Sequence, residues 1–496
     1  MVSTPPAVVA DPPYPEFAER AFARATGSEP IAGNSVRLLL DAQANYPAWL
    51  AAIADAQHCV LFESYIFDDD PVGREFAEAL AVKARAGVAV KVVVDWLGTR
   101  RFGALRTILT EAGAELRVFN PPRFDSPLGW LSRNHRKTVS VDGRTGFVSG
   151  LCVSAKWVGD PERGMEPWRD TGIEIRGPAV SELAHAFAQV WKACGEGISP
   201  IERSVATDSE EKAGETRVRV IAGAPSGTGT YRLDLVIASL ARRTLWLTDA
   251  YFVGTAAYVQ ALAAAARDGV DVRLLVPGAS DIPWLTPLSR ASYRALLAAG
   301  VRVFEWNGTM LHAKTAVADG LWSRVGSTNL NVASWMGNYE LDVAIEDRRF
   351  GAMMAAQYEI DLTHATEIVL TSHHRVRLAQ ARAEPLARRA RSGSAGRVAA
   401  GAVSVGSALG AALTNRRSLD AAESGLLVQV SIVAIGFALV AMLWPQVIAW
   451  PLAVLAAWVG IAWVIKAIAV RQRVRARDAL PIPASVEARR GGGEGA

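Results

Sequence analysis

Short apolar runs alternate with longer stretches of helical periodicity from about residue 35 onwards. In the first half the apolar runs include VRLLL, HCVLFESYIF and VAVKVVVD, and helical stretches such as GREFAEALAVKARAG lie between them. Runs of four to eight β-branched and aliphatic residues are typical of buried strands. Strands and helices in alternation, joined by short turns, predict an α/β fold.

The second half of the chain repeats this pattern. ARAGVAVKVVVD in the first half corresponds to ARDGVDVRLLVP in the second, and TEAGAELRVFN corresponds to LAAGVRVFEWN. Each segment carries a glycine where a helix ends and a strand begins, the usual position of a helix C-cap. An internal repeat of this length predicts two tandem α/β repeats that face one another, and it argues against a solenoid of short units.

Composition shifts along the chain mark the expected domain boundaries. The polar, non-periodic segment 201–217 predicts a linker between a first repeat at 33–200 and a second repeat at 218–374. The proline-rich amino terminus lacks the basic and apolar regions of a secretory signal, so no cleavage is expected there. We expect residues 1–32 to form a flexible segment.

The carboxyl-terminal part differs sharply from the two repeats. Residues 375–417 hold nine arginines and one acid, so segment 375–424 is expected to attract anionic lipid headgroups, although a disordered basic linker is compatible with the same sequence. Two apolar stretches follow within 425–470, each about twenty residues long, the length that crosses a bilayer. They predict a transmembrane helical hairpin, with a buried helical pair as the alternative. Arginines flank the hairpin on both outer sides, which places both ends in the cytoplasm. The tail, 471–496, is expected to be basic and then disordered.

Overall composition excludes several classes of protein. The 496 residues are 21% charged and 50% hydrophobic, as in a globular protein with an additional apolar segment. Cys59, Cys152 and Cys194 are far apart, so neither a disulfide framework nor a zinc site is indicated. A net charge of +4 is too small to indicate a nucleic-acid binder, and the strongest basic run belongs to the segment before the predicted hairpin.

The repeat also contains a duplicated motif, His-x-Lys-x-x-x-x-Asp. Its members are His135, Lys137 and Asp142, and then His312, Lys314 and Asp319. Side chains two apart on a strand share a face, so each histidine and its lysine point the same way. An imidazole attacks phosphorus or supplies a proton, and lysines neutralise phosphoryl oxygens. Each aspartate precedes a glycine, which fits hairpin closure as well as catalysis. One such histidine is more often structural, but two in equivalent positions favour a shared active site.

Small polar residues follow the second motif. Ser327 and Asn329 lie in SRVGSTNLN, where their side chains are expected to hydrogen-bond an oxyanion. In the first repeat the corresponding sequence is SGLC, with Cys152 in place of the asparagine.

With these motifs, residues 33–365 resemble the phospholipase D superfamily. Within it, the chain is most similar to bacterial cardiolipin synthases and their close phosphatidyltransferase relatives, on the segments NHRKTVSVDG, WRDTGIEIRGPAV and LHAKTAVADGLWSRVGSTNLN. The resemblance implies a pseudo-twofold α/β sandwich with the active site at the seam, a phosphohistidine intermediate, and no metal or cofactor. It assigns nucleophilic attack to His135 and general acid and base catalysis to His312. It also assigns phosphate binding to the two lysines and Asn329. Asp170 and Glu340 are expected to orient the histidines, and the sequence leaves their pairing open.

The function expected from the resemblance is that of a membrane-anchored phosphatidyltransferase that makes cardiolipin from phosphatidylglycerol or a similar phospholipid. The predicted hairpin favours the inner cell membrane, with the catalytic repeats in the cytoplasm, and a lipid substrate over a nucleic acid. No obligate protein partner is indicated. A phospholipase D that releases phosphatidic acid is the nearest alternative, followed by a nuclease or a non-catalytic scaffold.

Overall fold

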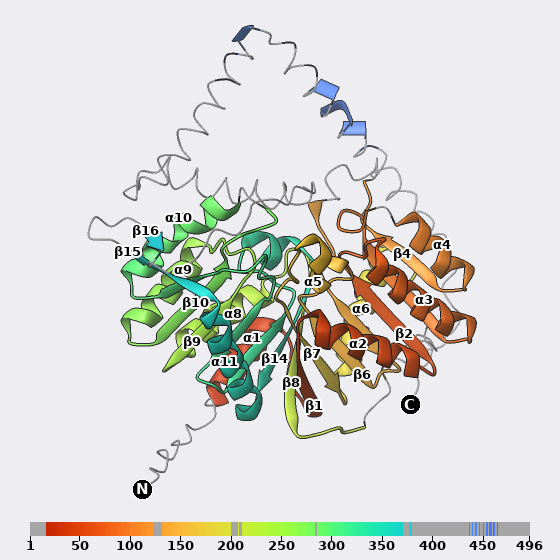
Figure 1. Ribbon diagram of the computed structural model, residues 1–496, viewed down its shortest axis with the longest axis horizontal. Coiled ribbons are helices and arrows are strands. Elements are labelled where there is room, and N and C mark those ends of the chain that lie inside the picture. The colour runs from red at the N-terminus through yellow and green to blue at the C-terminus, as the bar shows by residue number, and fades with distance from the viewer. Residues whose placement is uncertain are drawn as a thin grey trace, which may run out of the picture. The chain divides into compact units, whose positions relative to one another are not determined.

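The computed structural model describes residues 16–100, 102–122, 131–199, 207, 211–282, 285–370, 376–378 and single positions between 436 and 464. The chain divides into two units. One comprises Met1–Pro121 and Leu131–Leu426 and contains both repeats, and the other comprises Pro122–Trp130 and Leu427–Ala496. The fold described below is that of the first unit (Figure 1).

The described strands of this unit form one mixed sheet of 16 strands, whose two halves have the same strand order counted outwards from the central pair, β1 and β8. On one side the order is β1 (Ile31–Leu40), β7 (Thr171–Arg176), β6 (Thr145–Ser149), β5 (Thr138–Val141), β2 (Cys59–Ser64), β3 (Ala89–Asp95) and β4 (Glu115–Phe119). On the other it is β8 (Thr216–Gly223), β14 (Glu340–Glu346), β13 (Trp322–Gly326), β12 (Thr315–Ala318), β9 (Thr244–Thr248), β10 (Asp271–Pro277) and β11 (Arg302–Trp306), followed by β15 (Ala365–Leu370) and β16 (Val376–Leu378). The predicted α/β class and its internal repeat are confirmed.

Each half combines a parallel and an antiparallel part. Strands β2, β3 and β4 run parallel, as do β9, β10 and β11, whereas β5, β6 and β7 are antiparallel neighbours, like β12, β13 and β14. Parallel strands need crossover connections, and helices provide them. The two halves meet where β1 and β8 pair antiparallel.

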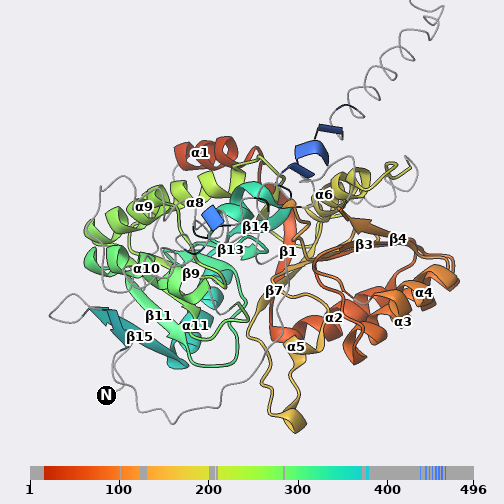
Figure 2. The same cartoon turned by 90° about the horizontal axis from the view of Figure 1, so that it is seen from above.

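Helices cover both faces of the first half (Figure 2). Helices α2 (Asp41–Asp55), α3 (Pro71–Arg85) and α4 (Gly103–Glu111) pack on one face, and α6 (Val180–Ala193) packs on the other. Strand β2 is apolar on both faces, and its side chains alternate between them. Val60 and Phe62 join the core under α2 and α3, and Cys59 and Leu61 join the core under α6.

The second half follows the same plan. Helices α8 (Gly229–Leu240), α9 (Ala256–Arg267) and α10 (Leu285–Ala298) cover one face, and α11 (Arg348–Thr363) covers the other. A further apolar core contains residues of both repeats, among them Ile173 of β7, Val218 of β8 and Leu341 of β14. This shared core fixes the two repeats against each other, and the candidate active site described below lies where they meet.

The amino-terminal segment is partly ordered, so the expectation that all of 1–32 is flexible is wrong. Residues Glu16–Thr26 form helix α1, which packs against α8. Ala18 and Phe22 are fully buried in the core of the second repeat, and the Phe22 ring stacks on Trp322 with 6.4 Å between centroids. Residues that precede the first repeat in sequence therefore complete the core of the second.

Most of the predicted carboxyl-terminal features lie outside the described residues. This holds for the tail at 471–496 and for segment 375–424 apart from β16, and most of the linker at 201–217 also lies outside them. Within 425–470 only single positions from Gly436 to Val464 are described, and these are helical. In the part of the chain that the structure describes, no helix is both long and apolar enough to cross a membrane.

Candidate active site

Backbone contacts between the repeats bring the two motifs together. Just before β5, the His135 backbone N–H donates to the Tyr339 carbonyl over 2.9 Å, and just before β12 the His312 N–H donates to the Arg169 carbonyl over 2.7 Å. Each motif therefore pairs with the residue before the candidate acid of the other repeat. Short bridges between Asn134 and Tyr339, and between Arg169 and Leu311, extend these contacts.

Each motif histidine pairs with the carboxylate of the opposite repeat. His135 Nδ1 lies 2.9 Å from Glu340 Oε2, and His312 Nδ1 lies 2.8 Å from Asp170 Oδ2. All four side chains are buried or nearly so. The sequence left this pairing open, and the structure shows that it crosses the seam between the repeats. Neither motif histidine therefore pairs with a carboxylate of its own repeat.

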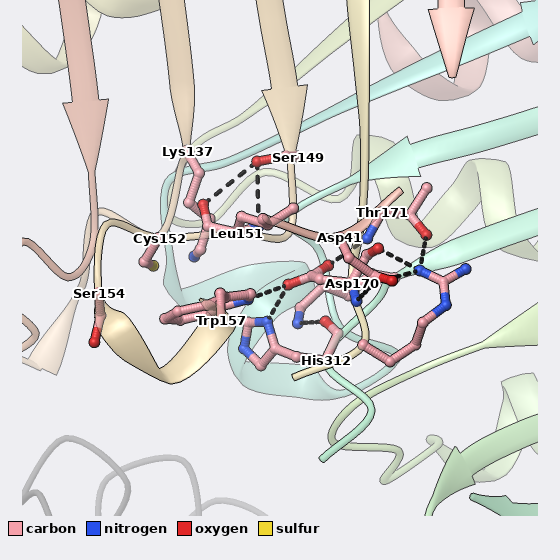
Figure 3. Close-up of polar contacts among 12 residues, drawn as sticks. Asp41, Lys137, Ser149, Leu151, Cys152, Ser154, Trp157, Asp170, Thr171 and His312 are labelled. Carbon is pink, nitrogen blue, oxygen red and sulfur yellow. Dashed lines mark hydrogen bonds and ion pairs between the residues drawn. The ribbon is translucent and has the colours of Figure 1, made fainter. Parts of the chain in front are cut away.

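A second donor holds each carboxylate oxygen that a histidine contacts. The Ser327 hydroxyl donates to Glu340 Oε2 over 2.6 Å, and the Trp157 indole N–H donates to Asp170 Oδ2 over 2.8 Å. In Figure 3 the Trp157 indole and the His312 imidazole both reach the same Asp170 carboxylate oxygen. A carboxylate beside Nδ1 favours the tautomer with the proton on Nδ1, which leaves the Nε2 lone pair available for reaction.

The charges of these pairs follow from their burial. Burial lowers the pKa of His135, although the Glu340 carboxylate acts in the opposite direction. Burial and the Lys314 ammonium lower the pKa of His312 to about 3. Burial alone would raise the pKa of Asp170 and of Glu340, but their histidines and hydrogen bonds outweigh it and lower both pKa values. At neutral pH both pairs therefore consist of a neutral imidazole and an ionised carboxylate.

The two lysines of the motifs belong to the same site. The Lys137 ammonium donates to the His135 carbonyl, and the Lys314 ammonium donates to the His312 carbonyl. Burial lowers the pKa of both lysines, that of Lys314 to about 8. Both ammonium groups act on the pKa of both histidines. A lysine carries three N–H donors, so each retains donors for a phosphoryl oxygen.

Asp142 and Asp319 bind backbone groups at the far end of their strands. Asp142 accepts from the N–H groups of Gln57, His58 and Cys59 over 2.7–2.8 Å. Asp319 accepts in the same way from three consecutive N–H groups, those of residues 242–244. Both aspartates have φ above 50°, as tight turns require. These contacts support the role in hairpin closure over the catalytic one.

The phosphate-binding residues expected after the motifs differ between the repeats. Asn329 is 3% exposed, its amide nitrogen donates to Ser334 over 3.4 Å, and its amide oxygen has no partner among the described residues. Cys152 occupies the equivalent position, 17 residues after its histidine, and packs into the apolar core of the first repeat. Burial raises the pKa of this thiol. Only the second repeat therefore offers an amide at this position.

Gly150 explains a further difference between the repeats. It stands where the second repeat has Ser327, and a Cβ at Gly150 would lie 2.2 Å from Asp170 Oδ1. A serine there would displace the carboxylate that pairs with His312. The indole of Trp157, from the short helix α5 (Ala155–Val158), supplies instead the donor that Ser327 provides to Glu340.

Two buried arginines escaped the sequence analysis. Arg136 donates to the carbonyls of Glu340 over 3.0 Å and Gly223 over 2.8 Å, so it joins the first repeat to the second. Arg169 forms an ion pair with Asp361 at 2.9 Å and donates to the Asp170 carbonyl. Both sit next to site residues, in HRK and WRD, and that placement was the available signal. The described residues contain no His, Cys, Asp and Glu group suited to holding a metal ion.

Comparison with known proteins decides the family. The family description "Cardiolipin synthase, PLD-like domain" matches residues 49–191 and 236–362. The chain belongs to this family. It is 32% identical over 346 residues to Cardiolipin synthase A of Pseudomonas entomophila, covering 68% of this chain and 70% of that one. It is 31% identical over 349 residues to Cardiolipin synthase 2 of Bacillus anthracis, covering 69% and 67%. This family member is therefore a PLD-type phosphatidyltransferase.

A solved structure supports the fold alone. Phosphatidylserine synthase of Haemophilus influenzae Rd KW20 superimposes with a TM-score of 0.55 at 14% sequence identity, over 71% of this chain and 91% of that chain. The mixed α/β architecture of the PLD-like family is thus shared at low sequence identity.

Proposed function

We propose that the protein is a cardiolipin synthase, which transfers the phosphatidyl group of one phosphatidylglycerol to a hydroxyl of a second and releases glycerol. The observation that carries the proposal is the pair of motif imidazoles, each held at Nδ1 by the carboxylate of the opposite repeat. The names of the relatives support the choice of substrate.

In the first half of the reaction, His135 Nε2 attacks phosphorus and the bond from phosphorus to the glycerol oxygen breaks. His312, protonated at Nε2, gives its proton to that oxygen, so glycerol leaves as a neutral alcohol. Binding of the anionic phosphodiester favours protonation of His312, because a nearby negative charge raises the pKa of an imidazole. The attacking imidazole becomes cationic as the phosphorus–nitrogen bond forms, and Glu340 lies 2.9 Å from its Nδ1.

In the second half, neutral His312 removes the proton from a hydroxyl of another phosphatidylglycerol. The oxygen attacks phosphorus, the bond to His135 breaks, and cardiolipin results. Lys137, Lys314 and Asn329 bind the non-bridging oxygens throughout, which stabilises the charge that develops on them. Ser327 acts through Glu340, because its hydroxyl donates to that carboxylate.

We also propose that residues 425–470 anchor the enzyme in the inner membrane with the repeats on the cytoplasmic side. The support lies in the sequence, which combines two long apolar stretches with arginines on both outer flanks. The basic segment 375–424 is suited to anionic headgroups, each arginine contributing about 1 kcal/mol near a charged surface.

The experiment that tests this function uses the purified, detergent-solubilised protein with phosphatidylglycerol and no nucleotide, followed by lipid separation. Cardiolipin and glycerol in equal amounts are expected, and phosphatidic acid as the main product would instead identify a hydrolase. His135→Ala and His312→Ala should each abolish transfer. A neutral quench followed by mass spectrometry should find the phosphatidyl group on His135, and its presence on His312 would reverse the two roles.

A further inference from the structure

Two tyrosines lie against the motif side chains, one in each repeat. The Tyr65 ring lies edge-to-face with the His135 imidazole at 5.0 Å between centroids, and the Lys137 ammonium lies 5.2 Å from the Tyr65 ring centroid. In the second repeat the Tyr251 ring meets His312 at 5.8 Å, and the Lys314 ammonium lies 5.7 Å from its centroid.

The tyrosines come from equivalent places in the two repeats. Tyr65 follows β2, which pairs with β5, and Tyr251 follows β9, which pairs with β12. The positions are not identical, because Tyr65 lies two residues after Glu63, the partner of Thr138, and Tyr251 lies three residues after Thr248, the partner of Thr315. Duplication of the sequence alone therefore does not account for both contacts. The same set of contacts nevertheless arises twice, which argues against chance packing of a single ring.

The contacts suit the two groups that they touch. Both ammonium groups are nearly fully buried, and the face of an aromatic ring within about 6 Å attracts a cation that has lost its water. An edge-to-face ring restricts rotation of the imidazole, while the carboxylate on Nδ1 fixes its tilt. Each histidine is thus held by a ring from its own repeat and by an acid from the other.

We propose that Tyr65 and Tyr251 are positioning residues of the two half-sites, in which each ring orients the imidazole and the ammonium of its own repeat. The ring performs this role, while the Tyr251 hydroxyl donates elsewhere, to Asp281 Oδ1 over 2.8 Å. The predicted changes in transfer rate rest on the proposed function. The predicted changes in histidine pKa do not, because the imidazoles are oriented and buried without substrate.

The variants are Tyr65→Phe, Tyr65→Leu, Tyr251→Phe and Tyr251→Leu in the full-length protein. Tyr231→Leu is the matched control, because this half-buried ring packs on Trp335 at 4.8 Å between centroids and its hydroxyl contacts Thr255. It reports the effect of losing a tyrosine ring from the second repeat at a position away from both motif histidines. Thermal unfolding measures the stability of all five variants.

The first readout is the pKa of each histidine, measured without lipid by deuterium exchange at the imidazole carbon and mass spectrometry. Tyr65→Leu should raise the pKa of His135 and leave His312 unchanged, and Tyr251→Leu should do the reverse, because loss of the ring admits water and burial is the main cause of the lowered values. The exposed His58, His185 and His364 serve as internal references.

The second readout is transfer activity. Each leucine variant should lose about 10- to 100-fold in kcat, the range expected when a reacting group is misplaced by about 1 Å, with KM changing much less. Each phenylalanine variant should stay within about threefold of the unsubstituted enzyme. If a leucine variant fails to fold, the phenylalanine variant carries the test, since a collapse of kcat in Tyr65→Phe or Tyr251→Phe would assign the role to the hydroxyl.

Unchanged histidine pKa values in folded leucine variants, or an equal loss of kcat in Tyr231→Leu, would overturn the proposal. Absence of cardiolipin with the unsubstituted enzyme would instead overturn the proposed function, and the histidine titrations would still decide the role of the rings.

Discussion

Replacing Glu340 by glutamine tests the pairing across the repeats. The substitution removes the negative charge 2.9 Å from His135 Nδ1 and keeps a side chain of the same shape. An opposite charge at this range changes a pKa by about 1 to 3 units, so the already lowered pKa of His135 should fall further when Glu340 loses its charge. His312, whose partner is Asp170, should keep its pKa.

The lost stabilisation of positive charge on His135 should also slow the reaction. About 2 pKa units, the middle of the range for a charge at this distance, correspond to about 2.7 kcal/mol. If the full positive charge develops on His135 in the transition state, transfer slows by about 100-fold. The roughly 100-fold loss is an upper bound, because the amide oxygen of the introduced glutamine still accepts a hydrogen bond from Nδ1.

The assay combines initial rates of cardiolipin formation in mixed micelles with the titration of individual histidines by deuterium exchange. Asp170→Asn is the mirror variant and should lower the pKa of His312 alone. Asp342→Asn is the control, because Asp342 is buried two residues further along β14 and its carboxylate accepts from Thr328. A Glu340→Gln variant that shifts His312, or that shifts neither histidine, would refute the crossed pairing.

Three further predictions follow from the same geometry. At saturating lipid, where the bound phosphodiester favours protonation of His312, the plot of kcat against pH should rise as His135 loses its proton, below its ordinary pKa of 6.5, because attack needs the neutral ring. The rate should fall at high pH as Lys314, whose pKa is about 8, loses its proton, and Lys314→Arg should move only this alkaline limb upwards. Asp319→Ala should destabilise the fold by about 2 to 3 kcal/mol in urea unfolding, because a carboxylate that binds backbone N–H groups is lost. The kcat per folded molecule should stay unchanged, and a loss of kcat at unchanged stability would make Asp319 catalytic. Cys152→Ser should keep transfer within about threefold, and its abolition would assign the thiol a direct role.

The sequence predicted the repeat and the motif because both are local patterns. Strand periodicity, the helix-ending glycines and the spacing of His135 and Lys137 are each readable within about ten residues. The pairing of acid and histidine is not local. Asp170 follows His135 by 35 residues, yet it contacts His312, from which it is separated by 142. Only the antiparallel meeting of the two halves brings that contact about.

Helix α1 and the active-site tyrosines were missed for related reasons. The segment Glu16–Thr26 carries an apolar stripe, but prolines precede it, and its binding surface belongs to residues more than two hundred positions later. Tyr65 and Tyr251 lie in aromatic and apolar runs that read as ordinary core. Nothing in such a run distinguishes a ring that packs on leucine from a ring that packs on imidazole.

The residues around the two crossed pairs make the two halves of the site different. A symmetric site would give both histidines equivalent surroundings, whereas the proposed transfer through a phosphohistidine needs one ring that attacks and another that moves a proton. Glu340 is held by the small Ser327 hydroxyl, and His135 remains the more exposed ring, with a side chain 12% accessible. Asp170 is held by the Trp157 indole, and His312 is enclosed by the rings of Trp157, Trp168 and Tyr251. Gly150 permits this second arrangement, because any side chain there would collide with Asp170. The duplicated motif supplies the two histidines, and the residues that differ between the repeats give each one its own environment.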